Sequence, residues 1–122
     1  MKRINVGVIG IGFIGPAHIE ALRRLGYIDV ISIADISTEI VKEKAEQLNI
    51  DRAYGDYKEL LEDKTIEVVH ICLPNHLHYS LVKEALLAGK HIVCEKPLAI
   101  NSRQGKELLE LVKKTGLIAA LH

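Results

Sequence analysis

The sequence has few cysteines, no excess of either charge and no long apolar run. Sixteen lysines and arginines balance sixteen aspartates and glutamates, so the formal net charge is zero with histidine neutral. A nucleic-acid-binding domain usually carries a basic stripe, and this balance argues against that class of protein. No apolar run approaches the roughly 20 residues that a membrane-spanning helix needs. The basic start of the chain leads into an apolar run that is too short and too glycine-broken for a signal peptide.

The two cysteines, Cys72 and Cys94, are too few for a disulfide scaffold and lack the spacing of metal ligands. Both lie in apolar runs, so we expect buried thiols in a reducing compartment, which indicates a cytoplasmic protein. The 122 residues, 48% of them hydrophobic, predict a single domain over 1–122 with a core of its own.

Apolar runs rich in β-branched residues alternate with segments whose apolar residues recur at helical spacing. In the first helix that stripe comprises Ile14, Ala17, Ala21, Leu22 and Leu25, and Gly26 ends the helix. Ser37 and Asn101 are expected to cap later helices. Strands are predicted over 4–9, 29–34, 52–54, 66–73, 91–94 and 117–121, with a helix in each interval.

This alternation predicts an α/β fold, a Rossmann-type doubly wound parallel sheet covered by helices on both faces. We expect the strand order 3-2-1-4-5-6. In such sheets ligands bind outside the carboxyl ends of the strands, at the point where the strand order reverses. The residues best suited to chemistry in this sequence all follow such ends.

A glycine-rich turn, Gly10-Ile11-Gly12-Phe13-Ile14-Gly15, follows the first predicted strand and opens the first predicted helix. Gly10 permits a tight turn, Gly12 lets a pyrophosphate approach the backbone, and Gly15 allows close packing of helix and strand. Free N–H groups at the helix start would hold the phosphates. The alternative is a structural turn in an α/β protein that binds no nucleotide.

Asp35 directly follows the second predicted strand, 20 positions after Gly15. A carboxylate there accepts hydrogen bonds from the adenosine ribose hydroxyls and repels a 2′-phosphate. Residues 36–38 offer no arginine to receive that phosphate, so NAD is favoured over NADP. A solvent-facing aspartate is the alternative. Flavin or S-adenosylmethionine binding also stays open on the fold alone.

Two further motifs follow later strands: Leu73-Pro74-Asn75-His76-Leu77-His78 and Glu95-Lys96-Pro97. Between them lies Ala85-Leu86-Leu87-Ala88-Gly89-Lys90-His91. Together with the glycine-rich turn, Asp35 and His18, this combination resembles the glucose–fructose oxidoreductase and inositol dehydrogenase (Gfo/Idh/MocA) family. The resemblance covers essentially the whole chain.

The resemblance implies a role for each matching residue. Leu73, Pro74 and Asn75 would line the nicotinamide half of the cofactor site, with His78 nearby. Glu95 would approach the nicotinamide ribose, and Lys96 would face the nicotinamide and the substrate hydroxyl. Pro97 would follow a cis peptide that fixes the direction of Lys96.

Lysine chemistry is compatible with that role, because a lysine beside a carboxylate and a cationic ring can titrate low enough for proton transfer. A surface lysine in a turn is the alternative for Lys96. His70 and His91 lie in predicted strands, and we expect structural roles for both. His76 and His78 have no companion at metal-ligand spacing, so no metal site is predicted.

The resemblance implies an NAD-binding domain of an oxidoreductase that oxidises a secondary alcohol of a sugar, cyclitol or related polyol. The family's second domain carries the substrate contacts and the usual oligomer interface. We therefore expect negligible turnover from these 122 residues alone, and a homo-oligomeric parent enzyme. The alternative is a free-standing module that senses NAD or NADH without turnover.

Overall fold

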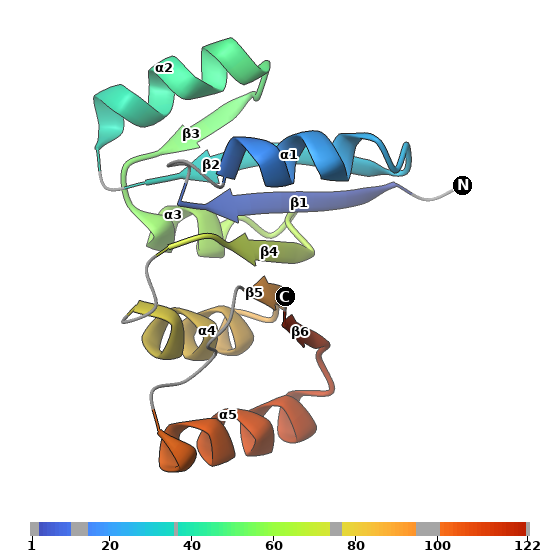
Figure 1. Cartoon of the computed structure of the whole chain (residues 1–122), viewed down its shortest axis with the longest axis vertical. Helices are drawn as coiled ribbons and strands as arrows, with labels where there is room; N and C mark the ends of the chain where they lie inside the picture. Colours follow the sequence, from blue (N-terminus) through green and yellow to red (C-terminus); the bar gives the residue numbers. More distant parts are fainter. Residues whose placement is uncertain (1–2, 11–14, 36, 74–76, 95–100, 122) are drawn as a thin grey trace.

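The computed structural model describes residues 3–10, 15–35, 37–73, 77–94 and 101–121. Within these residues, all strands run parallel in one sheet of order β3-β2-β1-β4-β5-β6 (Figure 1). The predicted fold class and strand order are confirmed. The strands are β1 (Ile4–Ile9), β2 (Ile28–Ala34), β3 (Arg52–Tyr54), β4 (Val68–Ile71), β5 (His91–Cys94) and β6 (Ala119–Leu121). The helices are α1 (Gly15–Arg23), α2 (Thr38–Leu48), α3 (Tyr57–Glu62), α4 (His78–Leu87) and α5 (Ser102–Thr115).

Alternate side chains of each strand enter two separate apolar cores, one on each face of the sheet. On one face, Val6 and Val8 of β1 pack with buried residues of α1 and α2. On the other face, Val69 and Ile71 of β4 pack with buried residues of α3, α4 and α5. Successive side chains of a strand point to opposite faces, so these β-branched runs supply both cores at once.

Side-chain caps fix where three of the helices begin. Backbone N–H groups donate to Ser37 Oγ from Ile40 (3.4 Å), to Asp56 Oδ1 from Lys58 (2.9 Å) and to Asn101 Oδ1 from Gln104 (2.9 Å). The predicted caps Ser37 and Asn101 are therefore confirmed. Each cap satisfies a backbone donor that has no partner within its helix.

The predicted buried stripe of α1 is partly wrong. Ile19 and Leu22 are buried, whereas Ala17, Ala21 and Leu25 are exposed. The helix ends at Arg23, so Leu25 lies beyond its last turn. Alanine tolerates either environment, which makes the helical spacing of small residues a weak guide to the buried face. Ile14 lies outside the described residues.

Helices cover both faces of the sheet as predicted, but the described residues leave one half of one face open. On the face that carries α1 and α2, the described residues leave an apolar hollow of about 530 Å³ over β4, β5 and β6. Val68, Val93 and Ala120 line this hollow, and Ile118 at its edge is 67% exposed. Right-handed crossovers place α1 and α2 over β1, β2 and β3, so neither helix reaches this half of the sheet.

Two smaller expectations also change. The fourth strand is shorter than the predicted 66–73, because β4 spans only Val68–Ile71. Cys94 is buried as expected, whereas Cys72, which follows β4, is only partly buried. No helix in the described ranges combines the length and the apolar character that crossing a membrane requires.

Polar contacts join the helices of the second face. Lys83 Nζ of α4 lies 2.7 Å from a carboxylate oxygen of Glu107 on α5, and the Tyr79 hydroxyl donates to the same carboxylate. Between α3 and α4, a side-chain hydrogen bond to Glu84, together with burial, raises the pKa of Tyr57 to about 12. The tyrosine therefore remains a neutral donor at physiological pH.

Ser32 lies on β2 and is fully buried. Within the described chain, its hydroxyl group has no hydrogen-bond partner. Replacing Ser32 with alanine removes a buried unsatisfied group, so we expect the free energy of unfolding to stay level or rise by up to about 1 kcal/mol. Urea denaturation measures this change. The matched control Ser37→Ala removes a helix cap and is expected to lose about 1 kcal/mol. A loss of similar size from Ser32→Ala would contradict the expectation.

Candidate cofactor-binding site

The carboxyl ends of four strands lie in one row across the sheet. Ile9 of β1 pairs with Ala34 of β2 on one side and with Ile71 of β4 on the other. Ile71 in turn pairs with Cys94 of β5. Gly10 and Asp35 directly follow members of this row, and Leu73 follows one by two residues, so the register brings these three residues to the same edge of the sheet.

Backbone hydrogen bonds hold the chain just beyond these strand ends. The N–H of Gly10 donates to the Ala34 carbonyl (2.8 Å), and the N–H of Cys72 donates to the Ile9 carbonyl (2.8 Å). The N–H of Asp35 donates to the Tyr54 carbonyl (3.1 Å). These bonds extend the sheet by one residue at β1, β2 and β4, so the entry to each motif is fixed by the sheet.

Gly10 occupies a position that other residues cannot adopt without strain. Its φ is 87°, in the left-handed region that favours glycine. A Cβ atom there would lie 2.8 Å from Leu73 Cδ2 and 2.9 Å from the Cys72 carbonyl carbon. Gly10, which directly follows β1, therefore passes against Cys72 and Leu73, the exit of β4, where the chain leaves that strand. The strand order reverses between β1 and β4.

Asp35 follows the last residue of β2 and is partly buried. Two positions later, Ser37 caps α2 through its Oγ. The carboxylate thus stands between the end of a central strand and the start of a helix, at the same edge as Gly10. That is the position from which an acidic side chain can accept hydrogen bonds from a ribose.

His78, the first residue of α4, is fully buried. Its Nε2 lies 2.6 Å from the carbonyl oxygen of Leu73, the second residue after β4. A carbonyl oxygen only accepts hydrogen bonds, so Nε2 carries the proton and donates it. The imidazole therefore joins the start of α4 to the exit of β4.

Most of the other predicted site residues belong to segments that the structure does not describe. Those outside the described residues are Gly12, Phe13, Ile14, Pro74, Asn75, Glu95, Lys96 and Pro97. Gly15 begins α1. Among the described residues, no three His, Cys, Asp or Glu side chains are grouped so as to hold a metal ion.

The described part of this edge suits a dinucleotide. A glycine at positive φ passes close to the neighbouring strand where the strand order reverses, and a carboxylate stands one strand away. Both are features by which doubly wound sheets hold a pyrophosphate and an adenosine ribose.

Comparison with known proteins agrees with this geometry. Residues 4–122 match the Gfo/Idh/MocA oxidoreductase family, whose fold is an NAD-binding Rossmann fold. The chain belongs to this family.

Relatives of known activity and structure resemble this Gfo/Idh/MocA domain. It is 35% identical over 115 residues to a myo-inositol 2-dehydrogenase from Thermotoga maritima, covering 94% of the chain and 34% of that relative. A levoglucosan dehydrogenase solved with NADH and L-sorbose has a TM-score of 0.92 and 33% identity, over 99% of the chain and 35% of that protein. A 3-ketoreductase from Actinomadura kijaniata, solved with NADP, has a TM-score of 0.92 and 30% identity, over 99% and 37%. The chain thus spans about a third of the length of these relatives.

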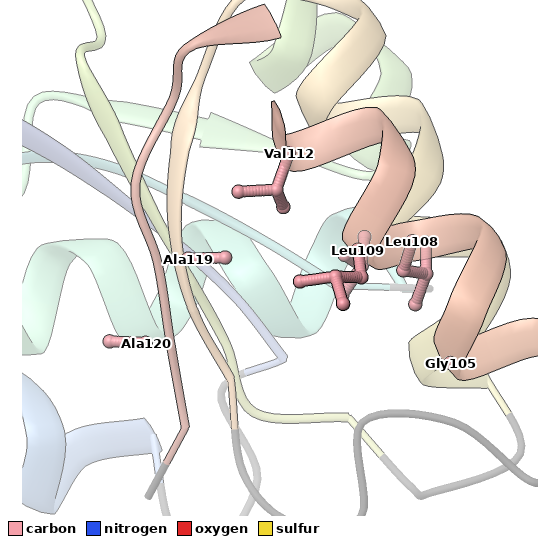
Figure 2. Close-up of a pocket in the computed structure, with 7 residues that line it drawn as sticks. Gly105, Leu108, Leu109, Val112, Ala119 and Ala120 are labelled. Carbon is pink, nitrogen blue, oxygen red and sulfur yellow. The ribbon is translucent and has the colours of Figure 1, made fainter. Parts of the chain in front are cut away.

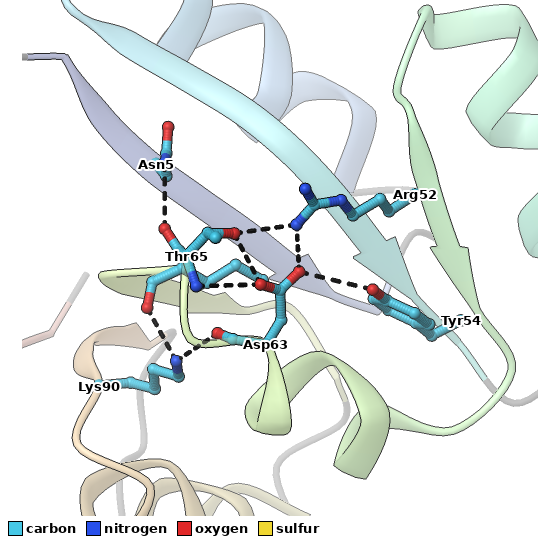
Figure 3. Close-up of polar contacts among 7 residues, drawn as sticks. Asn5, Arg52, Tyr54, Asp63, Thr65 and Lys90 are labelled. Atoms are coloured by element: carbon cyan, nitrogen blue, oxygen red, sulfur yellow. Dashed lines mark hydrogen bonds and ion pairs between the residues drawn. The ribbon is translucent and has the colours of Figure 1, made fainter.

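A polar cluster that sequence reasoning missed lies at the opposite, amino-terminal edge of the sheet of this Gfo/Idh/MocA domain (Figure 3). Lys90, which precedes β5, is 4% exposed, and its Nζ donates to the carbonyl oxygens of Asp63 (2.6 Å) and Ile66 (2.8 Å). The Asp63 carboxylate in turn accepts from Arg52 and Thr65. The lysine of the Gly-Lys-His motif is therefore tied into the structure, away from the cofactor edge.

The pKa values of two groups in this cluster, Lys90 and Asp63, are both lowered. Burial lowers the pKa of Lys90, and the nearby Asp63 carboxylate offsets part of that effect. For Asp63, burial acts to raise the pKa, but hydrogen bonds from Thr65 and Arg52 outweigh it and leave the pKa below its usual value. In the sequence, only the position of Lys90 directly before a predicted strand could have indicated this cluster.

The other predicted structural residues of the Gfo/Idh/MocA domain behave as expected. His70 is buried within β4. His91 Nδ1 accepts the N–H of Ile118 at 3.0 Å, which ties the start of β5 to the approach to β6. The burial of His70 and the hydrogen bond of His91 agree with the structural roles predicted for both.

An apolar cavity of about 290 Å³ lies between α5 and β6, with Val82 of α4 at its wall (Figure 2). Leu108, Leu109 and Val112 of α5 line one side of it. None of the residues that line it carries an ionisable or nucleophilic group, so this cavity offers no chemistry to a hydride-transfer reaction.

Proposed function

We propose that this chain is the NAD(H)-binding domain of a dehydrogenase that oxidises a secondary alcohol of a sugar, a cyclitol or a related polyol. The observation that carries the proposal is the meeting of Gly10 with the exit of β4 where the strand order reverses, with Asp35 one strand away. The names of the inositol and levoglucosan dehydrogenases support the substrate class.

The preference for NAD over NADP rests on Asp35 in this proposal. Its carboxylate accepts hydrogen bonds from the adenosine ribose hydroxyls and repels a 2′-phosphate, and residues 36–38 contain no arginine to bind that phosphate. Relatives solved with NADH and with NADP both resemble this chain, so the chain's own residues have to decide between the two cofactors.

The remaining site residues hold the two halves of the cofactor in this proposal. Gly12, Phe13, Ile14 and Gly15 offer backbone N–H groups to the pyrophosphate. Leu73, Pro74 and Asn75 line the nicotinamide, and Glu95 approaches its ribose.

The bound cofactor supplies the acceptor for the hydride. Lys96, directed by Pro97, faces the substrate hydroxyl and assists the removal of its proton. The base that takes this proton, the substrate contacts and the oligomer interface belong to a second domain of a longer, cytoplasmic protein. In this proposal the present domain orients the cofactor, and the second domain selects the substrate.

Calorimetric titration with NADH and NADPH tests the proposal. We expect wild-type protein to bind NADH more tightly. Because a hydrogen bond to a charged group contributes about 1.5–3 kcal/mol, Asp35→Ala is expected to weaken NADH binding about 10- to 100-fold and to abolish the preference over NADPH.

The matched control for that titration is Asp51→Asn, at an exposed aspartate directly before β3. This variant is expected to leave both affinities unchanged. Equal or tighter binding of NADPH by the wild type would overturn the assignment of Asp35, and absence of binding to either cofactor would overturn the proposed function.

A further inference from the structure

We propose that His78 is a positioning residue, which sets the nicotinamide side of the cofactor site by holding the exit of β4 from within the core. The inference rests on the proposed function. It differs from a direct contact with the cofactor, because the His78 side chain is fully buried.

The hydrogen bond from His78 joins the start of α4 to a backbone carbonyl only a few residues earlier in the chain. Leu73 and His78 are five residues apart, and residues 74–76 lie between them in the sequence. The Nε2–H of His78 donates to the Leu73 carbonyl at 2.6 Å. The imidazole thus fixes the orientation of the Leu73 peptide group where the chain leaves the sheet.

The donor itself is held rigidly by the helix that it begins. Leu81, Val82 and Ala85 of α4 are buried in the core on that face of the sheet. An imidazole on the first residue of this anchored helix has little freedom to move, and a fixed donor places its acceptor more accurately than a mobile one.

The acceptor is held against the other half of the site. A Cβ atom at Gly10 would lie within 2.8 Å of Leu73 Cδ2, so the Leu73 side chain packs directly against the glycine-rich turn. A displacement of Leu73 would alter the surface that meets the nicotinamide. Gly10, whose N–H is bonded to the Ala34 carbonyl, and Asp35, on the far side of β1, would keep their places.

This geometry predicts a difference between two ligands. ADP-ribose carries the adenosine and pyrophosphate but lacks the nicotinamide ring, whereas NADH carries all three. A residue that acts only on the nicotinamide side affects the affinity for NADH and spares the affinity for ADP-ribose. A residue that merely supports the fold affects both ligands alike.

The experiment measures both affinities by calorimetry on wild type, His78→Leu and His78→Gln. We expect His78→Leu, which has no donor, to weaken NADH binding about tenfold relative to ADP-ribose. We expect His78→Gln, whose side-chain amide can donate from a similar position, to recover part of that loss. Equal weakening of the two ligands, or unchanged NADH binding, overturns the inference.

His91→Leu is the matched control, since His91 also bonds to the backbone but at the amino-terminal end of β5. It is expected to reduce stability without changing the ratio of the two affinities. If His78→Leu does not fold, nitrogen NMR of the wild-type imidazole decides the point. We expect an Nε2-protonated ring whose Nε2 resonance shifts with NADH and not with ADP-ribose; an Nδ1-protonated ring, or equal shifts with both ligands, overturns the inference.

The two proposals fail in different ways. Wild-type protein that binds neither ligand removes the proposed function and this inference with it. Wild-type protein that binds both ligands, together with a His78→Leu variant of unchanged affinity ratio, removes the inference alone.

Discussion

Gly10→Ala is expected to lower the free energy of unfolding by about 3 kcal/mol, because the new methyl group meets strain and a collision together. The backbone φ of 87° disfavours any residue with a Cβ. The added atom would also lie 2.9 Å from the Cys72 carbonyl carbon, which belongs to the backbone and cannot turn aside. Urea denaturation measures the stability, and NADH titration is expected to show at least a tenfold loss of affinity.

Gly89→Ala separates the strain from the collision. Gly89 has a φ of 80°, close to that of Gly10, but apart from Gly89 and its two chain neighbours nothing lies within 4 Å of the position its Cβ would take. We expect this variant to lose only about 1 kcal/mol and to keep its affinity for NADH. If the two alanine variants were equally stable, the close approach of the turn to β4 would not contribute.

Lys90→Met is expected to lower the free energy of unfolding by about 2–3 kcal/mol. Methionine fills a similar volume but leaves the carbonyl oxygens of Asp63 and Ile66 without the donor that now serves both. Relief from burying a charge offsets part of this loss. The matched control Lys64→Met removes an exposed lysine from the connection between α3 and β4, which also carries Asp63 and Ile66, and is expected to change stability by less than about 0.5 kcal/mol.

The difference between wild type and Lys90→Met also depends on pH. The pKa of Lys90 is lowered in the folded protein, so the folded state releases this proton at a lower pH than the unfolded state does. Wild-type protein therefore gains stability from this group as the pH rises through the interval between the folded and unfolded pKa values. Denaturation at neutral and alkaline pH measures the change, and a stability difference that narrows with rising pH would contradict it.

Local sequence patterns located every strand to within a few residues. The strands β1 and β3 have the predicted bounds, whereas β4 and β6 are shorter than predicted. Ser37 and Asn101 cap helices through bonds to residues three positions away, a distance that a sequence shows directly.

Contacts between distant residues explain what the sequence could not show. Lys90 bonds to Asp63 and Ile66, more than 20 positions away, so its burial depends on how two crossovers pack. The motif that contains His78 indicated a place near the cofactor, but only the packing of α4 shows that its imidazole faces inward. In both cases the sequence shows the residue type but not the direction in which its side chain points.

The pairing of β1 with β4, the seam that joins the two halves of the sheet, has a consequence for how the protein folds. It pairs Val6 with Val68, so it closes a loop of about 60 residues, whereas β2 and β5 join the sheet through shorter crossovers. Pairing across a long loop pays a larger entropic cost before its contacts form, which favours late formation. Since Gly10 meets the exit of β4 on this seam, the candidate cofactor edge forms only when the two halves of the sheet have joined, and we expect NADH binding to report that joining.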